Sequence, residues 1–212
     1  MLVTDDRLVA GYDLVALARA AEAGGVTSVQ LRLKVAPARE QVGLARALVA
    51  ALGVPVLVND RPDIALAAGA AGVHLGGDDL PVALARAIAP SGFVIGASVG
   101  SDAETAAAVD ADYWGIGPWR VTTTKADAGT GLGADGFARL AQLAGGKPCL
   151  AIGAVRPDDV PFVHRAGGAG VGVVSGILGN SDSSEGQGPI REVAIREAAS
   201  RYAEAWTRVP HA

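Results

Sequence analysis

Short apolar runs alternate with longer segments of helical periodicity along the 212 residues of the chain. The runs are rich in valine, isoleucine and leucine, which is typical of strands buried on both faces. The predicted strands span residues 2–4, 28–34, 55–60, 72–76, 93–99, 113–117, 148–155 and 170–177. Between them alanine and leucine recur every three or four residues, which indicates helices. The predicted helices span residues 13–23, 37–52, 62–69, 81–89, 102–110, 134–145, 157–166 and 190–207.

Eight consecutive strand–helix units of this size predict an α/β fold, a (β/α)₈ TIM barrel in one domain over residues 1–212. An open, doubly wound parallel sheet is the structural alternative. Residues 179–188 (GNSDSSEGQG) interrupt the rhythm with glycine, serine and asparagine, and we interpret them as a flexible loop before the last helix.

The composition narrows the class of protein. Half of the residues are apolar, and 18 basic against 22 acidic residues give a net charge of −4, so nothing favours nucleic-acid binding. The first ten residues do not resemble a signal peptide, and no apolar stretch reaches the ~18 residues of a membrane span, so we expect a cytoplasmic protein. The one cysteine, Cys149, lies in an apolar run and is interpreted as a core residue. The sequence is compatible with a homo-oligomer but does not fix the oligomeric state.

Two basic side chains lie at the end of the second predicted strand. Side chains alternate along a strand, so Gln30, Arg32 and Lys34 share one face, and Leu31 and Leu33 share the other. With the leucines toward the helices, the polar three line the mouth of the barrel, where such folds place their chemistry. Two cations beside an amide suit a diphosphate. Solvated charges at a surface strand end are the alternative interpretation.

Carboxylates follow the third and fourth strands. Asn59 and Asp60 end the third, and Asp78 and Asp79 follow the fourth. Magnesium takes one or two carboxylates together with substrate phosphates, which fits such a pair opposite basic residues. Helix capping explains either aspartate alone but not their position beside a basic strand.

Other polar positions are individually weaker signals. Ser98 ends the fifth strand, and His74 lies within the fourth, where a supporting role is more usual than acid–base catalysis. The glycine-rich ends of strands seven and eight match the usual phosphate site of this architecture, although they also suit close packing. The loop after strand six, residues 117–129 (GPWRVTTTKADAG), gathers three threonines and a lysine.

In this order, the motifs resemble those of the thiamine-phosphate synthase family. The likeness extends from LVTDD to VVSGI and includes Q-x-R-x-K at residues 30–34, N-D at 59–60 and H-L-G-x-x-D at 74–79. It also includes the strand-five serine, Ser98, and a loop similar to G-P-x-x-P-T-x-T-K at residues 117–125.

The resemblance implies a transferase that uses Mg²⁺ and two small molecules, 4-amino-2-methyl-5-(diphosphooxymethyl)pyrimidine and 4-methyl-5-(2-phosphooxyethyl)thiazole, to form thiamine phosphate and diphosphate. The implied ligands of the pyrimidine diphosphate are Gln30, Arg32, Lys34, Asn59, Ser98 and Lys125. The implied metal ligands are Asp60 and Asp79. The implied contacts of the thiazole substrate are Thr122, Thr123, Thr124, Ala154, Val174 and Ser175.

The expected chemistry needs charge stabilisation more than a nucleophile. If the diphosphate leaves before the thiazole nitrogen attacks, negative charge grows on the leaving group, and Arg32, Lys34 and Lys125 would stabilise it as catalytic residues. This agrees with the lack of a convincing nucleophile–base set in the sequence.

The chain departs from the family pattern beside the site. Val121 replaces the usual proline, Arg120 an aromatic residue, and Ala154 a glycine that a positive φ would require. Leu33 and Ala169 replace usual acids. Two alternatives therefore stay open, a thiazole tautomerase-like isomerase and a non-catalytic protein that binds phosphorylated ligands. The isomerase is disfavoured because it usually has a histidine where this chain has Pro118, and lacks the paired aspartates.

Overall fold

The computed structural model describes residues 1–121, 131–179 and 189–209. Its eight strands are parallel, and each pairs with the next along the chain. They are Leu2–Val3 (β1), Val29–Leu31 (β2), Val56–Asn59 (β3), Gly72–Leu75 (β4), Val94–Val99 (β5), Tyr113–Ile116 (β6), Cys149–Ile152 (β7) and Gly170–Gly172 (β8). A bridge between Leu2 and Val173 joins the two edges. The predicted (β/α)₈ barrel is confirmed.

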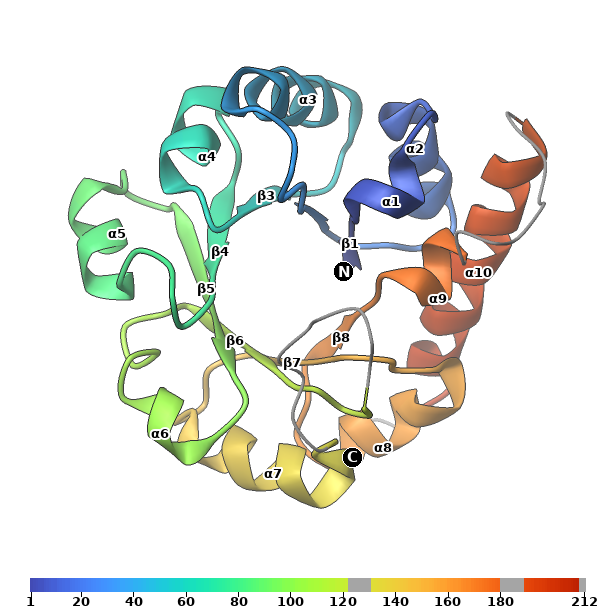
Figure 1. Ribbon diagram of the computed structural model, residues 1–212. Coiled ribbons are helices and arrows are strands. Elements are labelled where there is room, and N and C mark those ends of the chain that lie inside the picture. The colour runs from blue at the N-terminus through green and yellow to red at the C-terminus, as the bar shows by residue number, and fades with distance from the viewer. Residues whose placement is uncertain (122–130, 180–188, 210–212) are drawn as a thin grey trace.

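Helices surround the strands as an outer ring (Figure 1). They are Asp6–Val9 (α1), Leu14–Ala23 (α2), Ala38–Ala51 (α3), Pro62–Ala68 (α4), Val82–Ile88 (α5), Asp102–Thr105 (α6), Gly133–Leu143 (α7), Val160–Arg165 (α8), Ser175–Leu178 (α9) and Pro189–Thr207 (α10), with a 3₁₀ turn at Pro157–Asp159 (η1). The last helix, α10, contacts both α2 and α9. None of the helices in the described residues is long and apolar enough to cross a membrane.

The hydrophobic core lies between the strands and this ring of helices. Ile95, Ala97 and Val99 of β5 are all buried in it, because alternate residues of a strand face the helices. The intervening residues, Gly96 and Ser98, face the barrel interior. Strand alternation therefore assigns apolar side chains to the core and leaves the interior positions available for polar groups.

The helix predicted over residues 102–110 is shorter in the structure, where it is α6. It ends at Thr105, and residues 106–110 form turns, with Ala108 N donating to Thr105 O at 3.2 Å and Ala111 N to Ala108 O at 3.1 Å. The Trp114 indole N–H also donates to Ala108 O at 2.9 Å. A buried indole needs an acceptor, and here it takes a carbonyl that a longer helix would use.

The eighth strand also ends earlier than predicted. Ser175–Leu178 is helical (α9), and the adjacent residues Ile177 and Leu178 are both buried. Neighbouring residues of a strand point to opposite faces, whereas a helical turn against α10 buries both. Of the predicted loop 179–188, residues 180–188 lie outside the described residues.

Candidate active site

Arg32 and Lys34, the two cations that follow β2, are held in place by the segment that follows β1. The buried Thr4 hydroxyl accepts from Arg32 N at 2.8 Å and donates to Arg32 O at 3.2 Å. The Arg32 guanidinium lies 3.5 Å from Asp5, which also caps the N-terminus of α1. Two backbone bonds and an ion pair thus fix where this cation points.

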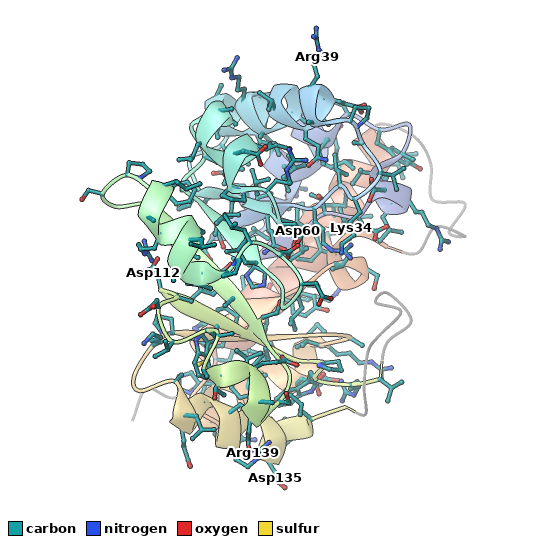
Figure 2. All side chains as sticks on the ribbon, turned by 60° about the vertical axis from the view of Figure 1, so that its left-hand side comes forward. Lys34, Arg39, Asp60, Asp112, Asp135 and Arg139 are labelled. Carbon is teal, nitrogen blue, oxygen red and sulfur yellow. The ribbon has the colours of Figure 1, made fainter. Side chains whose placement is uncertain are left out.

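Lys34 is fixed in the same way from the same side. Its backbone N–H donates to the Asp6 carboxylate at 2.8 Å, and the next N–H, of Val35, donates to the other oxygen at 3.1 Å. The Lys34 ammonium lies 3.7 Å from Asp60. Figure 2 shows Lys34 and Asp60 beside each other, with Asp112, Asp135 and Arg139 far from them.

Asp60 and Asp79 form a carboxylate pair. Burial, a hydrogen bond that protonated Asp60 donates to Asp79, and the charge of Asp79 raise the pKa of Asp60 to about 6, although Lys34 and Arg32 oppose this. Asp79 accepts from Gly76 N at 2.6 Å, which holds its carboxylate toward the loop after β4. Close carboxylates repel, and a divalent cation between them would relieve that repulsion.

These residues fit Mg²⁺ by their chemistry. The ion prefers oxygen ligands and keeps open positions for water and phosphate, and two carboxylates beside the Arg32 and Lys34 side chains leave such positions. Asp60 has a φ of 64°, a conformation that costs a non-glycine residue energy, and Asp60 N donates to His74 O at 2.8 Å. Asn59 lies half-buried at the end of β3, one residue before Asp60.

A chain of hydrogen bonds crosses the barrel interior and links two predicted ligand residues. Ser98 Oγ lies 3.0 Å from His74 Nε2, and His74 Nδ1 lies 2.9 Å from the Tyr113 hydroxyl. Gln30 hydrogen-bonds that hydroxyl in turn, while burial, the larger effect, raises the pKa of Tyr113. His74 is therefore a supporting group, as its position in the strand indicates. Tyr113 was not identified from the sequence as part of the site, because a tyrosine at the start of an apolar strand is typical of a core residue.

Two glycines provide the room for these rings. A side chain at Gly96 would lie 2.1 Å from the Tyr113 ring, and one at Gly115 would lie 2.9 Å from His74. Both distances are below contact range. Glycine at these positions therefore lets two large polar side chains share the interior with Ser98 and Gln30.

The ends of β6 and β7 approach each other through their backbones. Trp119 N donates to Ile152 O at 2.7 Å, and Arg120 N donates to Gly153 O at 3.0 Å. The φ angles of Gly153 and Ala154 are 97° and 51°. The expected conflict at Ala154 is thus present, since alanine occupies the left-handed region that glycine adopts without cost.

Arg120 is partly exposed to water, but it does not add a free cation. Its guanidinium forms two hydrogen bonds with the buried Asp159 carboxylate, one of them at 2.6 Å. Burial alone would raise the pKa of Asp159, but Arg120 and the Arg156 backbone N–H, which donates at 2.8 Å, hold it below its ordinary value. The residue that departs from the family pattern therefore ties the start of the loop to η1.

Val174 and Ser175 lie at the start of α9, directly after β8. The first N–H groups of a helix have no partner within it, which is the property that favours anions. With Gly153 and Ala154 they stand at the strand ends of the predicted phosphate half. The predicted loop residues Thr122, Thr123, Thr124 and Lys125 lie outside the described residues.

A barrel with paired carboxylates and cations at some strand ends, and glycine-rich backbone at the others, is typical of enzymes that act on phosphorylated small molecules. Comparison with known proteins is more specific. The chain belongs to the thiamine monophosphate synthase family, whose model matches residues 1–177.

Individual relatives agree with this assignment. The chain is 45% identical over 189 residues to a thiamine-phosphate synthase of Azorhizobium caulinodans, covering 87% of this chain and 89% of that one. It is 42% identical over 206 residues to the thiamine-phosphate synthase of Methanoculleus marisnigri, covering 94% and 97%. The solved thiamine phosphate pyrophosphorylase from Pyrococcus furiosus superposes with a TM-score of 0.81 at 32% identity, covering 97% and 94%. These findings do not favour the isomerase or the non-catalytic alternative.

Proposed function

We propose that the chain is a thiamine-phosphate synthase, a transferase that joins 4-amino-2-methyl-5-(diphosphooxymethyl)pyrimidine to 4-methyl-5-(2-phosphooxyethyl)thiazole. The products are thiamine phosphate and diphosphate. The observation that carries the proposal is the cluster of Arg32, Lys34, Asp60 and Asp79 at neighbouring strand ends. Such a cluster suits a diphosphate leaving group and a divalent cation. Because the proposed reaction is a biosynthetic step on small phosphorylated molecules, we propose that the enzyme acts in the cytoplasm.

The residues of the chain act on the leaving group. Arg32 and Lys34, together with Lys125, stabilise the negative charge that grows on the diphosphate as its C–O bond breaks. Asp60 and Asp79 would hold Mg²⁺, and a bound ion neutralises further charge on the diphosphate oxygens. Asp5 pairs with the Arg32 guanidinium, and Asp6 accepts the backbone N–H of Lys34, so contacts with the segment after β1 help to place both residues.

The remaining ligand residues orient the two substrates. Gln30, Asn59 and Ser98 would contact the pyrimidine diphosphate. Thr122, Thr123, Thr124 and the backbone at Ala154, Val174 and Ser175 would hold the thiazole phosphate. The thiazole nitrogen then lies in line with the carbon that loses diphosphate, and alignment supplies much of the acceleration.

A product assay tests the proposal. Purified protein is mixed with both substrates and Mg²⁺, and thiamine phosphate and diphosphate are measured, with a matched sample in a chelator. We expect equal amounts of the two products with metal and a large loss without it. A folded chain that binds both substrates but forms no product would overturn the proposal in favour of a binding protein.

A further inference from the structure

Arg191 is a buried cation in the first turn of α10. One of its guanidinium nitrogens donates to Leu8 O of α1 at 2.6 Å and to Leu178 O of α9 at 3.1 Å. The guanidinium carbon also lies 3.7 Å from the centre of the Tyr12 ring. This residue therefore joins α1, which follows the first strand, to α9, which follows the last (Figure 1).

The opposite end of α1 contacts Arg32 and Lys34, the residues proposed to bind the diphosphate. Asp5 pairs with the Arg32 guanidinium, and Asp6 accepts the backbone N–H groups of Lys34 and Val35. The helix is only four residues long, Asp6–Val9. A displacement of α1 would therefore act through Asp5 on the Arg32 guanidinium and through Asp6 on the backbone at Lys34.

A contribution to stability does not by itself explain why an arginine occupies the buried position 191. Within the described residues no carboxylate pairs with it, and its Nε has no hydrogen-bond partner. Burying a cation against neutral carbonyls is costly, and an apolar residue of similar size usually stabilises as well or better. A cation with carbonyl bonds to both α1 and α9 does what an apolar residue cannot, which is to fix their relative position.

We propose that Arg191 is a positioning residue that couples the two halves of the site through α1. Ordering of α9 by the thiazole phosphate orders α1 through Arg191, and α1 in turn orders Arg32 and Lys34 for the diphosphate. Each ligand then strengthens binding of the other, since the second finds the shared helix already fixed. The inference rests on the proposed function, because it assigns the two ligands to these two halves.

The test measures this coupling directly. The dissociation constant of the thiazole phosphate substrate is determined by calorimetry with and without saturating Mg²⁺ and inorganic diphosphate. For the wild-type chain we expect the diphosphate to tighten binding about tenfold, within the usual range for coupled sites. In Arg191→Lys, which keeps the charge but loses the planar guanidinium that stacks on the Tyr12 ring and reaches both carbonyls, the ratio falls below about twofold.

Two further variants separate coupling from general damage. Asp6→Asn weakens the other end of the same connection and should lower the ratio equally, with no additional loss when combined with Arg191→Lys. Arg46→Lys is the matched control: Arg46 donates to the Ala67 carbonyl near the end of α4 at 3.2 and 2.9 Å, on the outer ring of helices. It should keep the wild-type ratio. Should Arg191→Lys not fold, Asp6→Asn still provides the test.

The outcomes distinguish this inference from the proposed function. Turnover by the wild-type chain with a ratio near one, or an unchanged ratio in both Arg191→Lys and Asp6→Asn, would overturn the coupling alone. A wild-type chain that makes no thiamine phosphate would overturn the proposed function and the coupling with it. A general loss of packing would instead weaken both ligands equally and leave the ratio unchanged.

Discussion

The site has two halves, one at the ends of β2–β5 and one at the ends of β6–β8, and they use different chemical groups. The β2–β5 half uses charged side chains, each oriented by a partner: Arg32 by Asp5, and Lys34 by Asp6 and Asp60. In the part of the β6–β8 half that the structure describes, the site is formed by backbone, with left-handed residues at Gly153 and Ala154 and a helix start at Ser175. A mutation in the first half therefore acts on charges proposed to face the ligands. One in the second half acts on backbone conformation, either directly or through the Arg120–Asp159 ion pair.

The sharpest way to break the first half is to remove one carboxylate charge. Asp60→Asn keeps a side chain that tolerates the φ of 64° but abolishes the metal ligand charge. We expect metal-dependent kcat to fall at least about 100-fold, as for other lost charge-stabilising groups. Without metal the variant should be as stable as wild type or about 1 kcal/mol more stable, after allowing for solvent screening, because Asp60 no longer repels Asp79.

Turnover and thermal unfolding in a chelator measure these two effects. Asp63→Asn is the control, since Asp63 lies three residues away and its bonded partner is the exposed Arg61. Turnover of Asp60→Asn within threefold of wild type would remove Asp60 from the metal site.

In the β6–β8 half, the largest effect is expected from a substitution of Arg120. Arg120→Met leaves the buried Asp159 carboxylate without its bidentate partner, and we expect the free energy of unfolding to fall by about 2 kcal/mol at pH 7. The pKa of Asp159 is lowered in the folded chain. The ion pair therefore stabilises the fold at pH values above 3.8, the ordinary pKa of an aspartate. That contribution is lost as the pH falls below this value.

Urea denaturation from pH 7 down to pH 3 checks both statements. The difference between wild type and Arg120→Met should shrink below pH 4. A difference of the same size at every pH would mean that the variant loses packing rather than the ion pair.

Tyr113→Phe sharpens the comparison by removing one hydroxyl from the interior of the barrel. The variant loses hydrogen bonds to His74 and Gln30, and we expect about 1 kcal/mol less stability. The KM for the pyrimidine diphosphate should rise about fivefold, because Gln30 and Ser98 are less well oriented.

Steady-state kinetics with each substrate varied in turn measures that change. Tyr202→Phe is the matched control, since the Tyr202 hydroxyl donates to Val155 O at 2.9 Å outside this network. It should lose similar stability and leave the KM for the pyrimidine diphosphate unchanged. Equal KM values in the two variants would contradict a positioning role for Tyr113.

The smallest effect is expected at Ala154. Ala154→Gly relieves the strain of a φ of 51° but adds freedom to the unfolded chain, so the net gain is about 0.5 kcal/mol. The KM for the thiazole phosphate should fall by no more than about threefold. Thermal unfolding separates this from Ala141→Gly, which lies within α7 and should lose about 1 kcal/mol. Destabilisation in both variants would show that Ala154 is not strained.

The same contrast decides how much could be predicted from the sequence. The barrel and the β2 cations followed from strand periodicity, because alternation fixes which residues share a face. The helices α1 and α9 were missed, since four residues carry no helical period. The pairing of Arg120 with Asp159 joins residues 39 positions apart, and only the folded chain shows it. Ala154 was identified from its departure from a glycine pattern, and its positive φ bears that out.

The closeness of Gly96 to the Tyr113 ring has a consequence for how this barrel can change. A methyl group at position 96 would lie 2.1 Å from the ring, so Gly96→Ala is damaging while Tyr113 is present and tolerated once that ring is gone. The cost of one substitution thus depends on the residue at the other position, which is epistasis. Among related sequences the two positions should covary, with a side chain at 96 only where the aromatic ring at 113 has been lost.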